Sequence, residues 1–258
     1  MSTIPRVVLC VAIGLTLTLA CGDSPVNDVA LTTAQAQPLG ALRILFGHQS
    51  VGGNVIEGLA DLARDGELMP LVVTRGLQVD SAGKGVIAHE WVGENGAPAS
   101  KLAAVGDALA GPARGANVAI VKFCYSDFQA DTDPDALFAV YRDQVTAWHA
   151  RFPGVTFVHV TAPTVRPECA AARLLRTLRG RLTMRARAAK VARYNERLRE
   201  AYSGREPVID LAAYESAGPF LNPEFTDDGQ HLNEVGRKVV ARRVLGFLAD
   251  SVAPRVSR

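Results

Sequence analysis

Cysteine is scarce in this chain, with four residues in 258. Two of them, Cys10 and Cys21, fall in an N-terminal apolar segment, which leaves Cys124 and Cys169 for the remainder. Neither a Cys-x-x-Cys nor a His-x-x-x-His pair occurs, and such spacings are typical of zinc sites. We therefore expect no metal and no organic cofactor. The sequence leaves open whether Cys124 and Cys169 form a disulfide.

An excess of one charge sign is also lacking, because 28 Lys and Arg residues are balanced by 26 Asp and Glu residues. A net charge of +2 provides no strong field for nucleic acid, and no nucleic-acid partner is expected. The Arg-rich stretch 183–202 is the exception. Its apolar residues, from Met184 to Tyr202, recur every three or four positions, which predicts a solvated amphipathic helix. Contact of its arginines with anionic lipid headgroups is the alternative.

Long hydrophobic runs are absent except near the N-terminus, where "VVLCVAIGLTLTLA" follows Arg6. This run is shorter than a typical membrane-spanning helix and predicts a signal peptide over residues 1–20. It ends in "LTLAC", which resembles a bacterial lipobox with Cys21 as the lipidated residue. An ordinary secretory signal and an uncleaved anchor are the alternatives, and all three predict export. We expect the protein on the periplasmic side of a bacterial cell envelope, anchored to a membrane, with residues 21–40 as a flexible tether.

The rest of the sequence alternates between strand-like and helix-like patterns. Strands are predicted at residues 42–46, 70–74, 117–123, 155–161 and 207–211, and helices at residues 53–64, 99–110, 133–151, 171–203 and 233–250. Alternating elements of this kind predict a parallel sheet with helices on both faces, which is an α/β fold.

Ser50 lies just beyond the first predicted strand, in "RILFGHQSVGGNVIEGL". In a parallel sheet, ligands bind beyond the carboxyl ends of the strands. A serine at this position is usually a helix cap, so by itself it is weak support for a nucleophile. However, Asp228 and His231 lie three residues apart in the loop after the last predicted strand, on the same edge of the sheet. His231 could accept the proton of the serine, and Asp228 could orient the imidazole.

This combination, a serine and glycines after the first strand and a closing Asp-x-x-His before the last helix, resembles the SGNH/GDSL hydrolase superfamily. The resemblance covers residues 41–250, with 251–258 as a C-terminal tail. It implies a three-layer α/β/α, flavodoxin-like fold with a five-stranded parallel sheet, and hydrolysis of esters, often of acylated sugars or lipids. It also implies that Ser50 is the nucleophile, His231 the general base and Asp228 the orienting acid.

The motifs depart from the family pattern at two places. "GHQS" replaces the usual Gly-Asp-Ser, and "CYSD" replaces the usual Gly-x-Asn-Asp, so that Ser126 occupies the position of an oxyanion-binding asparagine. The resemblance assigns the oxyanion hole to the Ser50 N–H and to a glycine and an asparagine from later motifs. We favour Gly93 and Asn95, with Ser126 as the alternative donor.

Several neighbouring residues are predicted to bind substrate: His48, Gln49, Trp91 and Tyr125. Two others have more ordinary explanations. His159 is expected in the core or the pocket wall, and Asp210 is the reserve acid should Asp228 point away from His231.

The function predicted from these residues is that of an exported serine ester hydrolase. It would act through an acyl-enzyme on a small acyl ester, with an acetylated carbohydrate as the expected substrate, and we assume a monomer. Two alternatives stay open: a non-catalytic, glycan-binding envelope lipoprotein on the same fold, and a structural lipoprotein whose basic helix contacts lipid or a partner.

Overall fold

A computed structural model describes residues 30–67, 69–80 and 83–256 of the chain. Its centre is a six-stranded sheet with the order β2-β3-β1-β4-β5-β6, in which every neighbouring pair is parallel. The strands are β1 (Arg43–His48), β2 (Leu71–Arg75), β3 (Gly85–Trp91), β4 (Val118–Val121), β5 (Thr156–Val160) and β6 (Val208–Ile209). A short antiparallel pair, β7 (Ser216–Ala217) and β8 (Phe220–Leu221), lies apart from this sheet.

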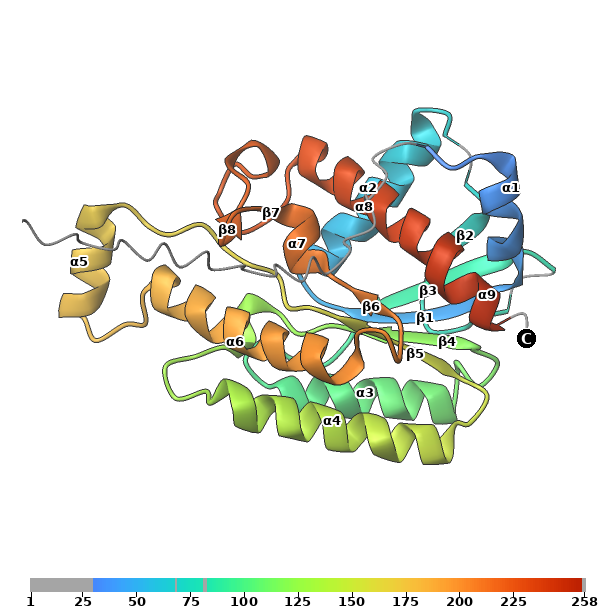
Figure 1. The fold of residues 1–258 in the computed structure, drawn as a ribbon, viewed down its shortest axis with the longest axis horizontal. Helices are drawn as coiled ribbons and strands as arrows, with labels where there is room; N and C mark the ends of the chain where they lie inside the picture. The colour runs from blue at the N-terminus through green and yellow to red at the C-terminus, as the bar shows by residue number, and fades with distance from the viewer. Residues whose placement is uncertain (1–29, 68, 81–82, 257–258) are drawn as a thin grey trace, which may run out of the picture.

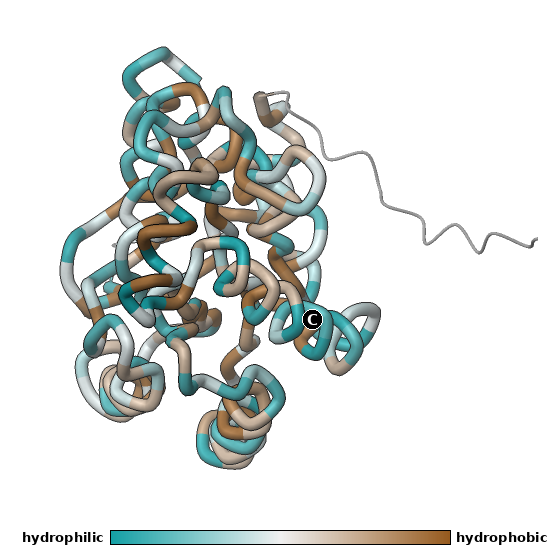
Figure 2. The backbone as a smooth tube through the Cα atoms, turned by 90° about the vertical axis from the view of Figure 1, so that its left-hand side faces the viewer, coloured by the Kyte–Doolittle hydropathy of each residue, from teal (hydrophilic) through white to brown (hydrophobic). Residues whose placement is uncertain are grey.

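Helices cover both faces of the sheet (Figure 1), so the predicted three-layer α/β/α class is confirmed. One face carries α1 (Thr33–Ala36), α2 (Val51–Arg64), α7 (Leu211–Glu215), α8 (Glu234–Phe247) and α9 (Ala253–Val256). The opposite face carries α3 (Pro98–Ala110), α4 (Pro134–Arg151) and α6 (Met184–Tyr202). Each face has its own hydrophobic cluster. Figure 2 shows the hydrophobic stretches gathered in the interior of the fold.

The sheet has six strands where five were predicted, because β3 was missed. Its sequence, "GVIAHEW", begins with four buried residues and ends with polar or exposed ones. The second half reaches the edge of the sheet where the loops begin, so the apolar pattern stops halfway along the strand. β3 lies between β2 and β1 and therefore brings Trp91 next to His48 in register.

The single helix predicted over 171–203 is in fact two helices, α5 (Ala170–Leu178) and α6. Gly180 adopts a φ of +62°, which ends the first helix, and the Thr183 side chain accepts a hydrogen bond from the Ala186 N–H to cap the second. Helix propensity is similar on both sides of this break, so periodicity alone does not reveal it.

The folded part extends beyond residues 41–250 at both ends. Helix α1 and a 3₁₀ turn, η1 (Gln37–Ala41), precede the sheet. Leu39 in this turn is fully buried in the hydrophobic cluster on the sheet face that carries α2 and α8. After α8 the chain continues through a π-helical turn, Leu248–Val252, into α9, with Val252 and Ala253 buried. The predicted signal segment, Cys21 and the first part of the tether lie outside the described residues. Among the helices that the structure describes, none is long and apolar enough to cross a membrane.

Candidate active site

Ser50 lies in the turn that joins β1 to α2, at the carboxyl edge of the sheet. Its backbone has φ 48° and ψ −114°, and within the described residues it is the only non-glycine with a positive φ. Such a conformation costs of order 1–3 kcal/mol and persists only where the surroundings enforce it, most often at functional sites. The strain therefore marks this turn as a place where the fold holds a side chain in a defined position.

The capping explanation for Ser50 does not fit its side chain. Ser50 occupies the N-cap position of α2, but its hydroxyl makes no capping hydrogen bond. The Oγ atom is buried and has no hydrogen-bond partner in the described structure. A buried hydroxyl without a partner is costly, so this position is not explained by local stability.

The first turn of α2 approaches β1 very closely, and Gly52 makes this possible. A Cβ atom at Gly52 would lie 2.4 Å from the Cβ of His48 and 2.9 Å from the Cε of Lys122. At the neighbouring Gly53 the nearest atom would be 3.9 Å away. Gly52 therefore allows the tight turn that sets the Ser50 backbone, whereas Gly53 has room for a side chain.

Asp228 and His231 form the pair that the motif predicts. The distance from His231 Nδ1 to Asp228 Oδ2 is 2.7 Å, and Asp228 Oδ1 accepts the backbone N–H groups of Gln230 and His231 at 2.7 and 2.8 Å. Burial alone would raise the pKa of Asp228, but these hydrogen bonds outweigh it and lower the pKa to about 2. The carboxylate is thus ionised at neutral pH and accepts the Nδ1 proton, which leaves Nε2 as the basic nitrogen.

The His231 loop docks on the helix that begins after Ser50. The Leu232 N–H donates to Asn54 Oδ1 at 3.2 Å, and the ring centroids of His231 and Tyr125 are 6.4 Å apart. Within the described residues neither the Ser50 hydroxyl nor His231 Nε2 makes a hydrogen bond, so the two groups are not bonded to each other. Catalytic hydrogen bonds of ligand-free enzymes are often long and tighten only with substrate.

Asp210, the reserve acid, is engaged elsewhere. Its carboxylate pairs with Arg199 at 2.7 and 2.8 Å and accepts the Ala213 N–H at the start of α7. His159 lies in the core as expected, with Nδ1 2.8 Å from the Tyr141 hydroxyl. Neither side chain contributes to the candidate site.

A buried ion pair, missed by the sequence analysis, joins the first turn of α3 to the segment that follows β4. Lys101 Nζ lies 2.9 and 2.6 Å from the carboxylate oxygens of Asp127, and both side chains are almost completely buried. Asp127 also accepts the N–H groups of Gly96 and Cys124 at 2.8 and 2.7 Å. Lys101 had no signal as a single lysine, but it shares the buried face of α3 with Leu102 and Val105.

The side chain of Gln49 connects this assembly to the Ser50 turn. Its Nε2 donates to the carbonyl of Gly93 at 2.9 Å. The Cys124 Sγ lies 3.6 Å from the Gln49 carbonyl oxygen, so the turn also contacts the segment after β4. Gln49 thus positions the loop rather than lying free to bind a ligand.

Cys124 is buried and Cys169 exposed, and both are free thiols, so the two do not form a disulfide.

The oxyanion-hole residues differ in how they are placed. Asn95 is exposed, and its Oδ1 accepts a hydrogen bond from Lys101 at 3.1 Å, which leaves its NH₂ group as the free donor. Ser126 has a buried Oγ without a partner. The other buried side-chain N and O atoms without partners in the described structure are His48 Nδ1, Ser50 Oγ and Arg187 Nε. The Ser126 hydroxyl is therefore a better candidate for an oxyanion-hole donor than the sequence motif indicated.

His48 and Trp91 line the β1–β3 side of the Ser50 turn. His48 Nε2 lies 3.0 Å from His89 Nδ1, and the ring centroids of His48 and Trp91 are 6.2 Å apart. Burial, aided by the charges of His89 and Lys122, lowers the pKa of His48 to about 3, so its imidazole is neutral. Trp91 is 56% exposed and presents its ring to solvent.

Tyr125 lies between the His231 loop and α6. Burial raises the pKa of its hydroxyl, and its ring stacks under the guanidinium of Arg187 at 5.9 Å from the centroid. Arg187 Nη1 also donates to the Tyr125 carbonyl at 3.4 Å. Tyr125 and Arg187 thus form one wall beside His231.

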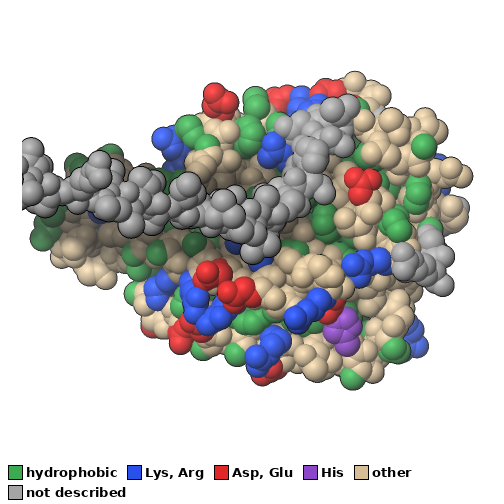
Figure 3. Space-filling view, viewed as in Figure 1, with side chains coloured by type: hydrophobic (Ala, Val, Ile, Leu, Met, Phe, Trp, Pro, Cys, Tyr) green, Lys and Arg blue, Asp and Glu red, His purple; other side chains and the backbone are tan. Residues whose placement is uncertain are grey.

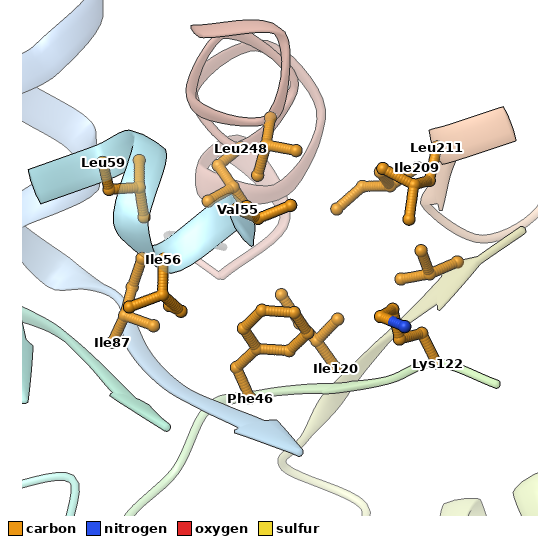
Figure 4. A pocket seen from close by; sticks show the side chains of 12 residues that line it. Phe46, Val55, Ile56, Leu59, Ile87, Ile120, Lys122, Ile209, Leu211 and Leu248 are labelled. Carbon is orange, nitrogen blue, oxygen red and sulfur yellow. The ribbon is translucent and has the colours of Figure 1, made fainter. Parts of the chain in front are cut away.

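A buried lysine beneath the Ser50 turn was also not anticipated. Lys122 lines an otherwise apolar cavity of about 30 Å³ between α2 and the sheet, and Figure 4 shows its nitrogen among hydrocarbon side chains. Its Nζ donates to Cys124 Sγ at 3.3 Å. Nearby Glu215 is buried, which raises its pKa to about 8 although the Thr164 N–H donates to it at 2.6 Å. In the sequence, Lys122 lies inside the apolar run "NVAIVKF", where no motif distinguishes it.

No cluster of three or more His, Cys, Asp or Glu side chains suited to a metal ion occurs in the described part of the chain. An open cleft of about 420 Å³ lies beside the loop that holds Asp228 and His231. It is lined on one side by Asp227 to Gln230 and on the other by residues preceding and within α5 and at the start of α6.

Comparison with known proteins shows which solved structures share this fold. No protein-family model and no curated protein sequence matches the chain. Among solved structures, a provisionally assigned acylhydrolase from Bacteroides fragilis shares 15% identity over 83% of this chain and 87% of its own, with a TM-score of 0.52. A lipase/acylhydrolase from Enterococcus faecalis shares 14% identity over 80% of this chain and 94% of its own, with a TM-score of 0.50. The chain therefore shares its α/β fold with these two acylhydrolase structures.

Proposed function

We propose that the protein is a serine ester hydrolase that works through an acyl-enzyme. The observation that carries this proposal is Ser50, whose strained backbone and unpartnered hydroxyl lie on the edge of the sheet that also holds the Asp228–His231 pair. Several hydrolases present their nucleophile on a strained strand-to-helix turn of this kind.

The mechanism follows from the groups in place. Ser50 Oγ attacks the ester carbonyl while His231 Nε2 takes its proton, and Asp228 stabilises the imidazolium. The tetrahedral intermediate expels the alcohol, which receives the proton from His231. Water then attacks the acyl-enzyme, giving its proton to His231, and Ser50 recovers a proton as the acid leaves. The oxyanion would be bound by the Ser50 N–H, with the Gly93 loop, Asn95 and the Ser126 hydroxyl as further donors.

The proposed substrate is a small acyl ester on a carbohydrate. An exposed indole 6.2 Å from the buried His48 ring offers a flat surface on which a sugar ring can stack. We also propose export to the cell envelope with Cys21 as a lipid anchor, which rests on the N-terminal sequence alone.

Steady-state hydrolysis of p-nitrophenyl acetate and of an acetylated oligosaccharide tests the proposal. We expect both activities to fall by at least about 10³-fold in Ser50→Ala and His231→Ala, and to be unchanged in the surface control Ser203→Ala. Trp91→Ala should raise KM for the oligosaccharide only. Hydrolysis that survives in Ser50→Ala would remove Ser50 from the mechanism, and a Trp91→Ala variant with unaltered KM would remove the sugar-stacking role.

A further inference from the structure

Helix α5 exposes an apolar face. None of its nine residues is buried, and Leu174, Leu175 and Leu178 are exposed by 60%, 47% and 75%. Three leucines at spacings of one, three and four residues form a continuous stripe on one side of the helix. Figure 1 shows α5 projecting from one end of the molecule, away from the sheet, and Figure 3 shows hydrophobic side chains on that end.

Among the described residues, four arginines that form no ion pair lie within α5 and in the segment that follows it. Arg173, Arg179, Arg181 and Arg185 are all exposed, and in the described structure none of them forms an ion pair. Arg176, by contrast, donates a hydrogen bond to the Leu182 carbonyl and forms an ion pair with Glu168.

The arginines farther along α6 are different. Arg193 pairs with Asp135 and Glu196, and Arg197 pairs with Asp135 and Glu200. Figure 3 shows blue and red side chains interleaved along that side of the molecule. Among residues 170–202, the exposed arginines without an ion pair therefore all lie within residues 170–185, which we call the α5 hairpin.

The α5 hairpin is attached to the candidate active site. The Glu168 carboxylate accepts the Met184 N–H at 2.9 and 3.0 Å, which fixes the base of the hairpin. The 420 Å³ cleft runs between this base and Asp228. A surface that docks the hairpin would thus hold the cleft, and with it the loop of Asp228 and His231, close to that surface.

We propose that the α5 hairpin docks on an anionic lipid bilayer, with its leucines at the acyl-chain boundary and its arginines among the phosphate groups. Amphipathic helices with an apolar stripe and a cationic flank bind bilayer interfaces, and anionic lipid adds to the attraction for each basic residue. A second copy of the chain fits less well, because two hairpins packed through their leucines would bring their arginines together. This proposal does not depend on the esterase mechanism.

The test uses an environment-sensitive fluorophore on the full-length chain. Cys10, Cys21 and Cys169 are changed to serine, and an NBD group is attached to Leu178→Cys or, as a matched control, to Thr177→Cys on the flank of the same helix. Vesicles of phosphatidylglycerol and phosphatidylcholine are added, and the emission shift is recorded. We expect a blue shift at position 178, a much smaller one at 177, and little change at either position with pure phosphatidylcholine.

Replacing Arg173, Arg179, Arg181 and Arg185 by glutamine should raise the lipid concentration for a half-maximal shift by roughly 10²–10³-fold. Three results would overturn the proposal. One is no shift at position 178 on anionic vesicles. Another is equal shifts at 177 and 178. The third is a blue-shifted label at 178 before any lipid is added, which would mean that another part of the chain or a second copy already covers the leucines.

Discussion

Replacing Gly52 by alanine would place a methyl group 2.4 Å from the His48 Cβ and 2.9 Å from the Lys122 Cε, whereas the same change at Gly53 meets nothing closer than 3.9 Å. Both glycines lie in the first turn of α2. Alanine in a helix is favoured over glycine by roughly 0.5–1 kcal/mol where it fits. Overpacking a buried site costs about 1–3 kcal/mol, because the neighbours must move.

We therefore expect Gly53→Ala to be neutral or stabilising by up to about 1 kcal/mol, and Gly52→Ala to destabilise by about 1–3 kcal/mol. Gly52→Ala should also lower esterase activity by about 10²-fold, because a small displacement of the Ser50 turn misplaces the nucleophile. Urea unfolding followed by circular dichroism gives the stabilities, and an unchanged m value shows that they are comparable. Equal stability and activity in the two variants would refute the close approach of α2 to β1.

Three further predictions concern strain, a buried ion pair and pH. Ser50→Gly should raise the unfolding free energy by roughly 1 kcal/mol while abolishing activity, and a destabilised variant in urea unfolding would argue against the strained turn. Asp127→Ala strands the Lys101 ammonium and should cost about 3–5 kcal/mol, whereas the exposed Asp135→Ala should cost far less. Similar losses in the two variants would contradict the buried pair. Because the pKa of Glu215 is raised to about 8, the folded carboxyl keeps a proton that the unfolded one releases near pH 4.5. Its contribution to stability is complete below that pH and is lost as pH rises to 8, so Glu215→Gln should show a flatter stability profile from pH 5 to 8, and parallel profiles would speak against the buried acid.

The sequence was sufficient to place the candidate residues on one edge of the sheet. Alternating strands and helices fix a parallel sheet, and in such a sheet the loops holding Ser50 and His231 emerge on the same side. The spacing of Asp228 and His231 was also enough to predict their hydrogen bond, which is local in the chain. These features depend on short-range patterns and on topology.

Other features depend on contacts between distant residues and could not be predicted. The positive φ at Ser50 occurs where the first turn of α2 packs closely on β1, and the Lys101–Asp127 pair joins residues 26 apart that have no motif in common. Strand β3 was missed because its apolar pattern covers only its first half. The break between α5 and α6 depends on one glycine in a left-handed conformation, and so the exposed face of α5 could not be recognised.

The central claim is that Ser50 is an activated nucleophile, and the most direct measurement is labelling with a fluorophosphonate probe, with the modified peptide identified by mass spectrometry. The account predicts one adduct, on Ser50, that is lost in Ser50→Ala and forms far more slowly in His231→Ala. A folded parent protein that stays unlabelled, or that carries the adduct on another residue, would contradict it.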